Sequence, residues 1–547
     1  MDAEFEAIVV GGGVVGAGIA RDLAMRGVRT MLVEKRDFSA GTTGTCSGMI
    51  HGGLRYLEFD VATTQASCQD AGYIRKIAPH LCFRIPFLIP VYPEARYSVD
   101  IMETVLEGYG RFSPLKDGKP SARLTEAEAL SLEPGLMRGM RGAVTLDEWG
   151  IDPFRLVLGN VLDAAAHGAV VKNHTEVVAV DRRDGAIAGV RLKSRGQGPA
   201  SRVGCKVLVN AAGPWAPRLA ELAGARIRQR PGKGTHLIFA GRISNYGLIA
   251  PAVDGRELLL VPHESCTLLG TTDDDYYGDP DDAVATREEA DYLYEGAMRL
   301  LPELANHRVM RVMTGIRPTL YQWGINEDKL PREHALVDHA AEGVPGFFTM
   351  HGGKLATFRI MAEETASAVL AKLGRSAPCR THEMPLPGGD HVPDATDLAR
   401  EQGIDPLTAH KLVRRHGSAA RRILDEGKKD RTGLSVACAC EGVLECEVRH
   451  AIRHELCEDL ADLGRRTRVG WGPCQGLHCT LRCAALFASE KGLAPDAMHR
   501  LAYESLKSRF RGVRPLCEGA QLAHEEIAQQ SWAHAGYADL FGEGPPS

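Results

Sequence analysis

The chain has 547 residues, which is too long for a single hydrophobic core, so several domains are expected. Its hydrophobic content of 44% and charged content of 25% are ordinary for a globular protein, and its formal charge of −5 gives no reason to expect a nucleic acid partner. No run of about 20 apolar residues is present, and the acidic start over residues 1–6 argues against a secretory signal peptide. These features favour a cytoplasmic protein and leave attachment to a membrane surface open.

The N-terminal segment has the pattern of a dinucleotide-binding β-α-β unit. Residues 6–10 and 30–34 are predicted to be buried strands, and apolar residues at helical spacing predict a helix over 14–25. Gly11, Gly13 and Gly16 stand between the first strand and this helix, where they permit a tight turn, close approach to a pyrophosphate and close helix packing. Glu34 ends the second strand, where its carboxylate can accept hydrogen bonds from ribose hydroxyls. The unit predicts an α/β opening domain that binds a nucleotide.

The rest of the chain predicts a second sheet followed by helices. Further strands are predicted at 169–172, 177–181 and 206–209, and residues 258–261 with 268–270 predict a hairpin in another sheet. Residues 385–393 are rich in proline and glycine and predict a linker. Residues 395–427 and a tail after residue 490 predict helices.

Three segments that lie far apart in the sequence favour FAD over NAD. Residues 41–48 are rich in small polar side chains, residues 209–215 end a strand in a second glycine turn, and residues 352–358 put glycines ahead of a predicted helix. Together they fit one extended cofactor that threads the domain. The candidate FAD contacts are Gly11, Gly13, Val14, Gly16, Glu34, Lys35, Thr42, Thr43, Ser47, Gly48, Val177, Ala211, Gly213, Trp215, Gly353, Lys354, Leu355 and Thr357.

Four short segments carry a resemblance to a known family. They are His51-Gly-Gly-Leu-Arg55-Tyr56, Gly270-Thr-Thr-Asp273, Gly315-Ile-Arg317-Pro318 and Gly352-Gly-Lys354-Leu, and they resemble the FAD-dependent sn-glycerol-3-phosphate dehydrogenases. Over residues 1–390 the resemblance implies a Rossmann-like FAD-binding domain of the D-amino-acid-oxidase/glutathione-reductase type, interleaved with an antiparallel-sheet substrate domain. It also implies oxidation of sn-glycerol 3-phosphate to dihydroxyacetone phosphate.

The candidate substrate site follows from the charge of that substrate. A phosphate dianion needs fixed positive charge, and the planar fork of arginine suits it. Positions that match Arg55, Arg317 and Arg332 line the phosphate end in the related enzymes, and Tyr56 and Lys354 lie in the same motifs. The candidate substrate-binding residues are therefore Arg55, Tyr56, Arg317, Arg332 and Lys354.

Oxidation of a secondary alcohol also needs a general base, and histidine is the usual choice. His236, in Gly-Lys-Gly-Thr-His, resembles a family position near the substrate, whereas an arginine–water pair is the alternative. The candidate catalytic residues are His236, Arg317 and Arg55.

Four cysteines near the C-terminus stand in two close pairs. Cys438 and Cys440 are separated from Cys474 and Cys479 by 33 residues. Four thiolates can hold a [2Fe-2S] cluster or zinc, and the one-residue and four-residue spacings favour the cluster, with zinc as the alternative. Cys446, Cys457 and Cys483 are expected to pack in apolar helices. The basic run 465–468 is expected to be a solvated face, with a docking edge for an acidic partner as the minority interpretation.

The cysteine segment, residues 431–490, resembles the [2Fe-2S] domain of bacterioferritin-associated ferredoxins (BFD-like), with a helical linker at 391–430 before it and a helical tail at 491–547 after it. A flavin domain fused to this module resembles the large subunits of the anaerobic branch of the family. That resemblance implies B and C partner subunits, electron transfer towards a membrane quinone, and peripheral attachment to the inner face of the cell membrane. Two alternatives stay open: an amine or D-amino-acid oxidase, and an iron–sulfur binding module with a vestigial flavin domain.

Overall fold

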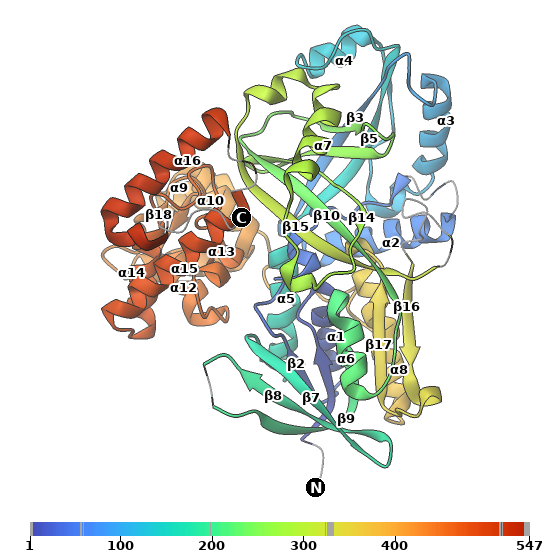
Figure 1. Cartoon of the computed structure of the whole chain (residues 1–547), viewed down its shortest axis with the longest axis vertical. Helices are drawn as coiled ribbons and strands as arrows, with labels where there is room; N and C mark the ends of the chain where they lie inside the picture. Colours follow the sequence, from blue (N-terminus) through green and yellow to red (C-terminus); the bar gives the residue numbers. More distant parts are fainter. Residues whose placement is uncertain are drawn as a thin grey trace.

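The computed structural model describes residues 4–54, 57, 60–196, 198–322, 324, 333–513, 516 and 518–540. Two large sheets lie one above the other, and the helices of the C-terminal third form a lobe against their side (Figure 1). The predicted mixed α/β architecture with a helical C-terminal region is confirmed. No helix in the described ranges combines the length and apolar character needed to cross a bilayer.

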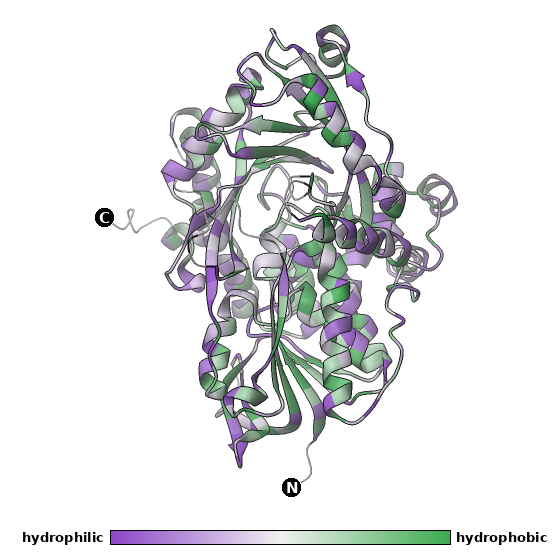
Figure 2. Ribbon diagram, turned by 90° about the vertical axis from the view of Figure 1, so that its right-hand side faces the viewer, coloured by the Kyte–Doolittle hydropathy of each residue, from purple (hydrophilic) through white to green (hydrophobic). Residues whose placement is uncertain are grey.

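The first sheet is the nucleotide-binding type, with β1 at its centre between β2 and β9, both parallel to it. Ala7, Ile8 and Val9 are fully buried, because helices α1, α5 and α8 cover one face while α6 covers the other. The strands of this lower sheet are accordingly hydrophobic along most of their length (Figure 2). Its described strands are β1 (Phe5–Val10), β2 (Thr30–Val33), β6 (Val170–Lys172), β7 (Thr175–Arg183), β8 (Ala186–Ser194), β9 (Ser201–Asn210), β16 (His334–Asp338) and β17 (Phe347–Gly352).

The second sheet is mostly antiparallel, and its longest pair is β10 with β15. The predicted hairpin is confirmed, since β12 and β13 pair antiparallel through Leu260 and Leu269. Its described strands are β3 (Cys82–Val91), β4 (Arg123–Leu124), β5 (Gly142–Ile151), β10 (Gln229–Ala240), β11 (Gly247–Pro251), β12 (Glu257–His263), β13 (Cys266–Gly270), β14 (Asp274–Asp275) and β15 (Val309–Leu320). The helices of these two parts are α1 (Val14–Met25), α2 (Val61–Ile77), α3 (Val99–Gly110), α4 (Glu126–Leu132), α5 (Pro153–Ala166), α6 (Ala216–Ala223), α7 (Arg287–Met298) and α8 (Phe358–Lys372).

The C-terminal lobe is helical, as predicted for residues 395–427 and for the tail. The segment predicted as a linker, residues 385–393, is partly built into the first domain, because Leu386 is buried and its N–H donates to Ile77 O over 2.8 Å. The lobe contains α9 (Ala395–Gln402), α10 (Pro406–His416), α11 (Ala419–Gly427), the short strands β18 (Val436–Cys438) and β19 (Val443–Leu444), α12 (Glu445–His454), α13 (Leu460–Thr467), α14 (Thr480–Lys491), α15 (Pro495–Val513) and α16 (Gly519–Trp532).

The basic run at the end of α13 joins this lobe to the first domain by ion pairs. Arg466 is 2% exposed and donates both terminal nitrogens to Asp37, over 2.8 and 2.7 Å. Arg468 pairs with Asp152 over 2.9 Å. The prediction that residues 465–468 form a solvated face or a docking edge is therefore wrong: their carboxylate partners lie more than 300 positions earlier in the chain, in the first domain.

Candidate active site and thiol cluster

A cavity of about 670 Å³ opens at the carboxyl end of β1. There Gly11, Gly13 and Gly16, which we call the glycine fingerprint, lead into α1. Its walls also come from β7, from the turn after β9 and from the turn after β17. Most of the predicted FAD contacts line it: Gly11, Gly13, Val14, Glu34, Lys35, Thr42, Thr43, Val177, Ala211, Gly213, Trp215, Gly353, Lys354 and Leu355.

The other four predicted contacts are not in its lining. Gly16 packs α1 against the first turn, and Ser47 and Gly48 line a second cavity. Thr357 is buried, and its hydroxyl donates to the carbonyl of Lys354.

Each glycine of the fingerprint is needed for a different physical reason. Gly11 has φ +115°, and a Cβ there would lie 2.4 Å from Ala211 O. A Cβ on Gly16 would lie 1.9 Å from Gly11 O, so only glycine lets the helix approach the turn. A Cβ on Gly13 would meet only the hydroxyl of Thr43, at 3.2 Å, and Gly13 itself lines the cavity. These glycines leave the N-terminus of α1 open to a phosphate.

The polar groups of the cavity fit a dinucleotide. Glu34 accepts hydrogen bonds from the N–H groups of Gly12 and Arg36, over 2.7 and 2.8 Å, and burial raises the pKa of its carboxyl. Trp215 Nε1 and His351 Nδ1 are buried in the lining without a hydrogen-bond partner among the described residues. A buried polar atom without a partner is costly, so both atoms favour a bound polar ligand here. The residues present therefore fit FAD.

Arg317 lies on β15 and crosses over β10. Its guanidinium donates to Asp273 Oδ1 over 2.6 Å and to Thr271 Oγ1 over 3.0 Å. A Cβ on Gly234 would lie 2.6 Å from Arg317 Nη2, so this glycine of β10 makes room for the arginine. The motif around residues 270–273 thus supplies groups that orient Arg317, a role that sequence reasoning did not assign to Asp273 or Thr271.

His236 lies on β10 and is 4% exposed. Its Nε2 is 2.8 Å from the hydroxyl of Ser47, and its Nδ1 has no hydrogen-bond partner among the described residues. Burial, and secondly the charge of Arg317, lower the pKa of His236 to about 3, so its imidazole is neutral at pH 7. The structure thus brings His236 within electrostatic reach of Arg317, although neither of the two cavities includes His236 in its lining.

The remaining predicted substrate residues are Arg55, Tyr56, Arg332 and Lys354. Arg55, Tyr56 and Arg332 lie outside the described residues. Lys354 Nζ donates to Gly52 O over 3.2 Å, so it contacts the segment that leads into Arg55.

A buried polar cluster, missed from the sequence, lies behind that segment. The hydroxyl of Tyr109 donates to Glu148, and Lys116 pairs with the same carboxylate. A Cβ on Gly52 would lie 2.3 Å from the Tyr109 hydroxyl. The three members come from different elements of the fold, so no local pattern joins them.

The four predicted metal ligands come together as two contacting pairs. Cys438 shares a hydrogen bond with Cys479, and this contact, together with burial, raises the pKa of Cys438. Cys440 contacts Cys474 in the same way, with burial as the main cause of its raised pKa. The N–H groups of Glu441 and Gly470 donate to the thiol of Cys438. Two thiols per metal and amide donors to sulfur fit a two-iron cluster.

A fifth thiol lies beside this set. Cys483, one turn further along α14, shares a hydrogen bond with Cys479 and is buried, in agreement with the packing role that was predicted for it. Its closeness to Cys479 could have been read from their four-residue spacing on one helix.

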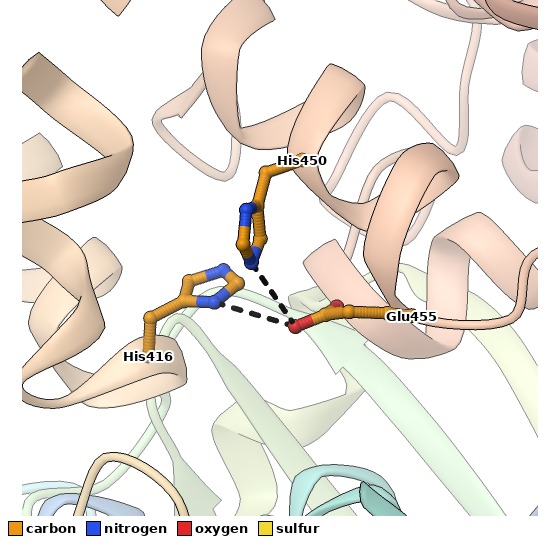
Figure 3. Close-up of side chains that lie close together, drawn as sticks. All are labelled: His416, His450 and Glu455. Carbon is orange, nitrogen blue, oxygen red and sulfur yellow. Dashed lines mark ion pairs between the residues drawn. The ribbon is translucent and has the colours of Figure 1, made fainter. Parts of the chain in front are cut away.

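His416, His450 and Glu455 form another cluster, in which both imidazoles point towards the carboxylate (Figure 3). The Nη1 of Arg155 already donates to Glu455 over 2.8 Å, and its Nη2 lies 3.3 Å from His416 Nδ1. His416 Nε2 lies 3.0 Å from Glu447, so the ring fits a neutral tautomer that donates to Glu447 and accepts from Arg155. The guanidinium of Arg155 already lies where a metal cation would bind between these side chains. The cluster is therefore an internal network that joins the lobe to α5.

Two family models match the chain. One, described as FAD dependent oxidoreductase, matches residues 6–367, and one, described as C-terminal domain of alpha-glycerophosphate oxidase, matches residues 379–497. The chain is 34% identical to the A subunit of the anaerobic glycerol-3-phosphate dehydrogenase of Escherichia coli (strain K12), over 98% of this chain and 97% of that protein. It is 31% identical to the glycerol-3-phosphate dehydrogenase of Mycobacterium leprae (strain TN), over 91% of this chain and 86% of that protein.

Solved structures agree with these matches. The glycerol-3-phosphate dehydrogenase from Bacillus halodurans, complexed with FAD, superposes with a TM-score of 0.74 at 25% identity, over 94% of this chain and 96% of that one. Glycine oxidase from Geobacillus kaustophilus shares the fold of 70% of this chain, covering 99% of its own, with a TM-score of 0.53 at 22% identity.

Proposed function

The chain belongs to the family of FAD-dependent glycerol-3-phosphate dehydrogenases, and from this premise we propose that it oxidises sn-glycerol 3-phosphate to dihydroxyacetone phosphate. The observation that carries the proposal is the setting of Arg317. Its guanidinium is held by Asp273 and Thr271, within electrostatic reach of a neutral buried histidine. A fixed arginine fork beside a potential base suits a small phosphorylated alcohol.

The chain's own residues would divide the work between binding and proton transfer. Arg317, with Arg55 and Arg332 as proposed by the resemblance, would bind the phosphate, and Lys354 and Tyr56 would complete the site. FAD, when bound in the 670 Å³ cavity, supplies the acceptor for the hydride that leaves C2. Asp273 fixes the direction of the Arg317 fork, so less side-chain freedom is lost when the phosphate binds.

His236 would take the proton of the C2 hydroxyl. Its ring is neutral at pH 7, so one nitrogen can accept a proton, and the contact with Ser47 orients the ring. Burial is the main cause of the low pKa of His236, and the charge of Arg317 lowers it further; a phosphate dianion next to Arg317 would offset that second contribution. Substrate binding would therefore raise this pKa, in the direction that makes His236 a better general base.

The thiol pairs would hold a [2Fe-2S] cluster that receives electrons after substrate oxidation. The support is the 2 + 2 arrangement of Cys438 with Cys479 and Cys440 with Cys474, because each iron of such a cluster takes two thiolates. Iron, sulfide and zinc analysis of the purified protein tests this assignment directly. Iron and sulfide in equal amounts support it, and stoichiometric zinc contradicts it.

We propose that a membrane quinone is the final electron acceptor, reached through partner subunits. The support is that the Escherichia coli relative is named as one subunit of an anaerobic dehydrogenase. Peripheral attachment to the inner face of the membrane would follow from those partners. Co-purification from membranes with partner proteins, and reduction of a quinone analogue only in their presence, is the expected result.

An anaerobic visible spectrum before and after addition of sn-glycerol 3-phosphate tests the central proposal. Loss of the flavin absorbance is expected, with a broad residual absorbance from the cluster. Glycine and a D-amino acid serve as controls. Bleaching by either of them, without bleaching by glycerol 3-phosphate, would replace the proposal with an amine oxidase.

A further inference from the structure

A second cavity, of about 760 Å³, lies between the flavin-binding domain, the second sheet and the C-terminal lobe. We call it the interdomain cavity. Cys46 lines both this cavity and the one that fits FAD. Gly470, whose N–H donates to Cys438, also lines it. The interdomain cavity therefore borders both proposed redox sites.

Arg311 of β15 is the unusual side chain in its lining. It is only partly exposed, and within the described part of the chain its guanidinium has neither an ion pair nor a hydrogen bond. Instead it lies over the ring of Trp471, whose centroid is 4.8 Å away. Burial, and then the charges of Arg465 and Arg468, lower the pKa of Arg311 to about 10.

The neighbouring charges leave this arginine uncompensated. Arg465 contacts Asp37 over 3.0 Å, and Arg468 contacts Asp152 over 2.9 Å, so both have carboxylates of their own outside the cavity lining.

The acidic residues of the lining are also engaged or exposed. Three of them pair with other cations and two are exposed to solvent. The three pairs are Asp459 with Arg195, Glu441 with Lys411, and Glu264 with Arg414.

We propose that the interdomain cavity binds a small organic anion, which carries a phosphate or a carboxylate on an apolar body. The anionic group would lie against Arg311, because a desolvated guanidinium among other guanidinium groups is stabilised by an oxyanion and its planar fork matches one. The apolar body would lie against Leu268, Met310 and Leu501, which line the same space.

Isothermal titration of the FAD-loaded, cluster-containing protein with phenyl phosphate tests this inference. We expect one site with a dissociation constant below about 1 mM, and weaker binding of inorganic phosphate, which lacks the apolar body. Arg311→Gln should weaken phenyl phosphate binding at least tenfold. Arg299→Gln, at an exposed arginine paired with Glu295, is the matched control and should leave it unchanged.

The proposed substrate site also has arginines, so Arg317→Gln is titrated in parallel. Binding that persists in Arg317→Gln and weakens in Arg311→Gln supports the interdomain cavity. The reverse pattern assigns the probe to the substrate site and overturns the inference, as does absence of binding to the unaltered protein. If Arg311→Gln does not fold, Arg311→Lys keeps the charge without the fork and should still weaken binding. Equal affinity in Arg311→Lys and the unaltered protein would count against Arg311 as the ligand.

Discussion

The close approach of Gly234 to Arg317 gives the sharpest test of the proposed substrate site. In Gly234→Ala the new Cβ would lie 2.6 Å from Arg317 Nη2 and 2.8 Å from Thr271 Oγ1. Both atoms belong to side chains, and the end of the arginine side chain is flexible. The variant should therefore fold, with the guanidinium of Arg317 displaced. A displaced charged hydrogen bond is worth about 1.5–3 kcal/mol. We therefore expect kcat/KM for sn-glycerol 3-phosphate to fall by about 10- to 150-fold.

The assay is steady-state oxidation of sn-glycerol 3-phosphate with an artificial electron acceptor, together with a thermal unfolding curve for each variant. Gly110→Ala is the matched control, because among the described residues no atom outside its own helical turn lies within 4 Å of the added Cβ, and it should keep the original kcat/KM. In an Arg317→Ala background, Gly234→Ala should have little further effect. Full additivity of the two changes, or an unchanged kcat/KM in Gly234→Ala, would refute the reasoning.

Three further predictions concern the lobe. Cys479→Ser should lower the bound iron and sulfide, measured by chemical analysis, whereas Cys446→Ser, which changes a thiol buried away from the four, should not. Asp37→Asn leaves the buried guanidinium of Arg466 without its carboxylate, so the free energy of unfolding from denaturant titration should fall by about 3–5 kcal/mol. Burial lowers the pKa of His450 to about 4. As the pH falls, the histidine is therefore protonated in the unfolded chain before it is protonated in the folded one, and stability should fall between about pH 6.5 and pH 4. In His450→Gln the melting temperature should depend less on pH over this range.

Each of these has a matched comparison. Asp291→Asn breaks the exposed pair with Arg287 and should change stability by less than about 1 kcal/mol. His410→Gln, at an exposed histidine, should leave the pH profile of the melting temperature unchanged. An Asp37→Asn variant as stable as Asp291→Asn would mean that Arg466 finds another partner, and a pH profile unaltered by His450→Gln would place the sensitivity on other groups.

The sequence predicted those parts of the fold and site that depend on neighbours along the chain. The helix over 14–25 was placed at its observed bounds, because apolar periodicity and the glycine turn are both local. The four candidate cysteines were likewise picked out by their spacing, but their contacts cross between the two sequence pairs, Cys438 with Cys479 and Cys440 with Cys474. Partnerships across long separations were not: Arg317 and Asp273 are 44 positions apart, and nothing in either segment states that they meet.

The basic run at 465–468 shows why such partnerships escape a sequence-based interpretation. Three arginines in four residues have the same composition whether water or carboxylates surround them, and water is the more common case. The carboxylate that pairs with the buried guanidinium of Arg466 lies 429 positions away, at Asp37, directly after the nucleotide-binding unit. Only the three-dimensional packing of the lobe on the first domain decides between the two environments.

This packing bears on the proposed electron transfer. Exchange of electrons between a flavin and a cluster requires a fixed separation, which a flexible linker between residues 385 and 393 would not supply. The bidentate pair of Arg466 with Asp37 and the pair of Arg155 with Glu455 both cross the contact between lobe and first domain, and all four side chains are almost fully buried. Buried pairs of this kind add little net stability but are costly to break singly, so they fix orientation more than they strengthen the fold. Their role here is accordingly geometric: they hold the thiol pairs at one position relative to the glycine fingerprint.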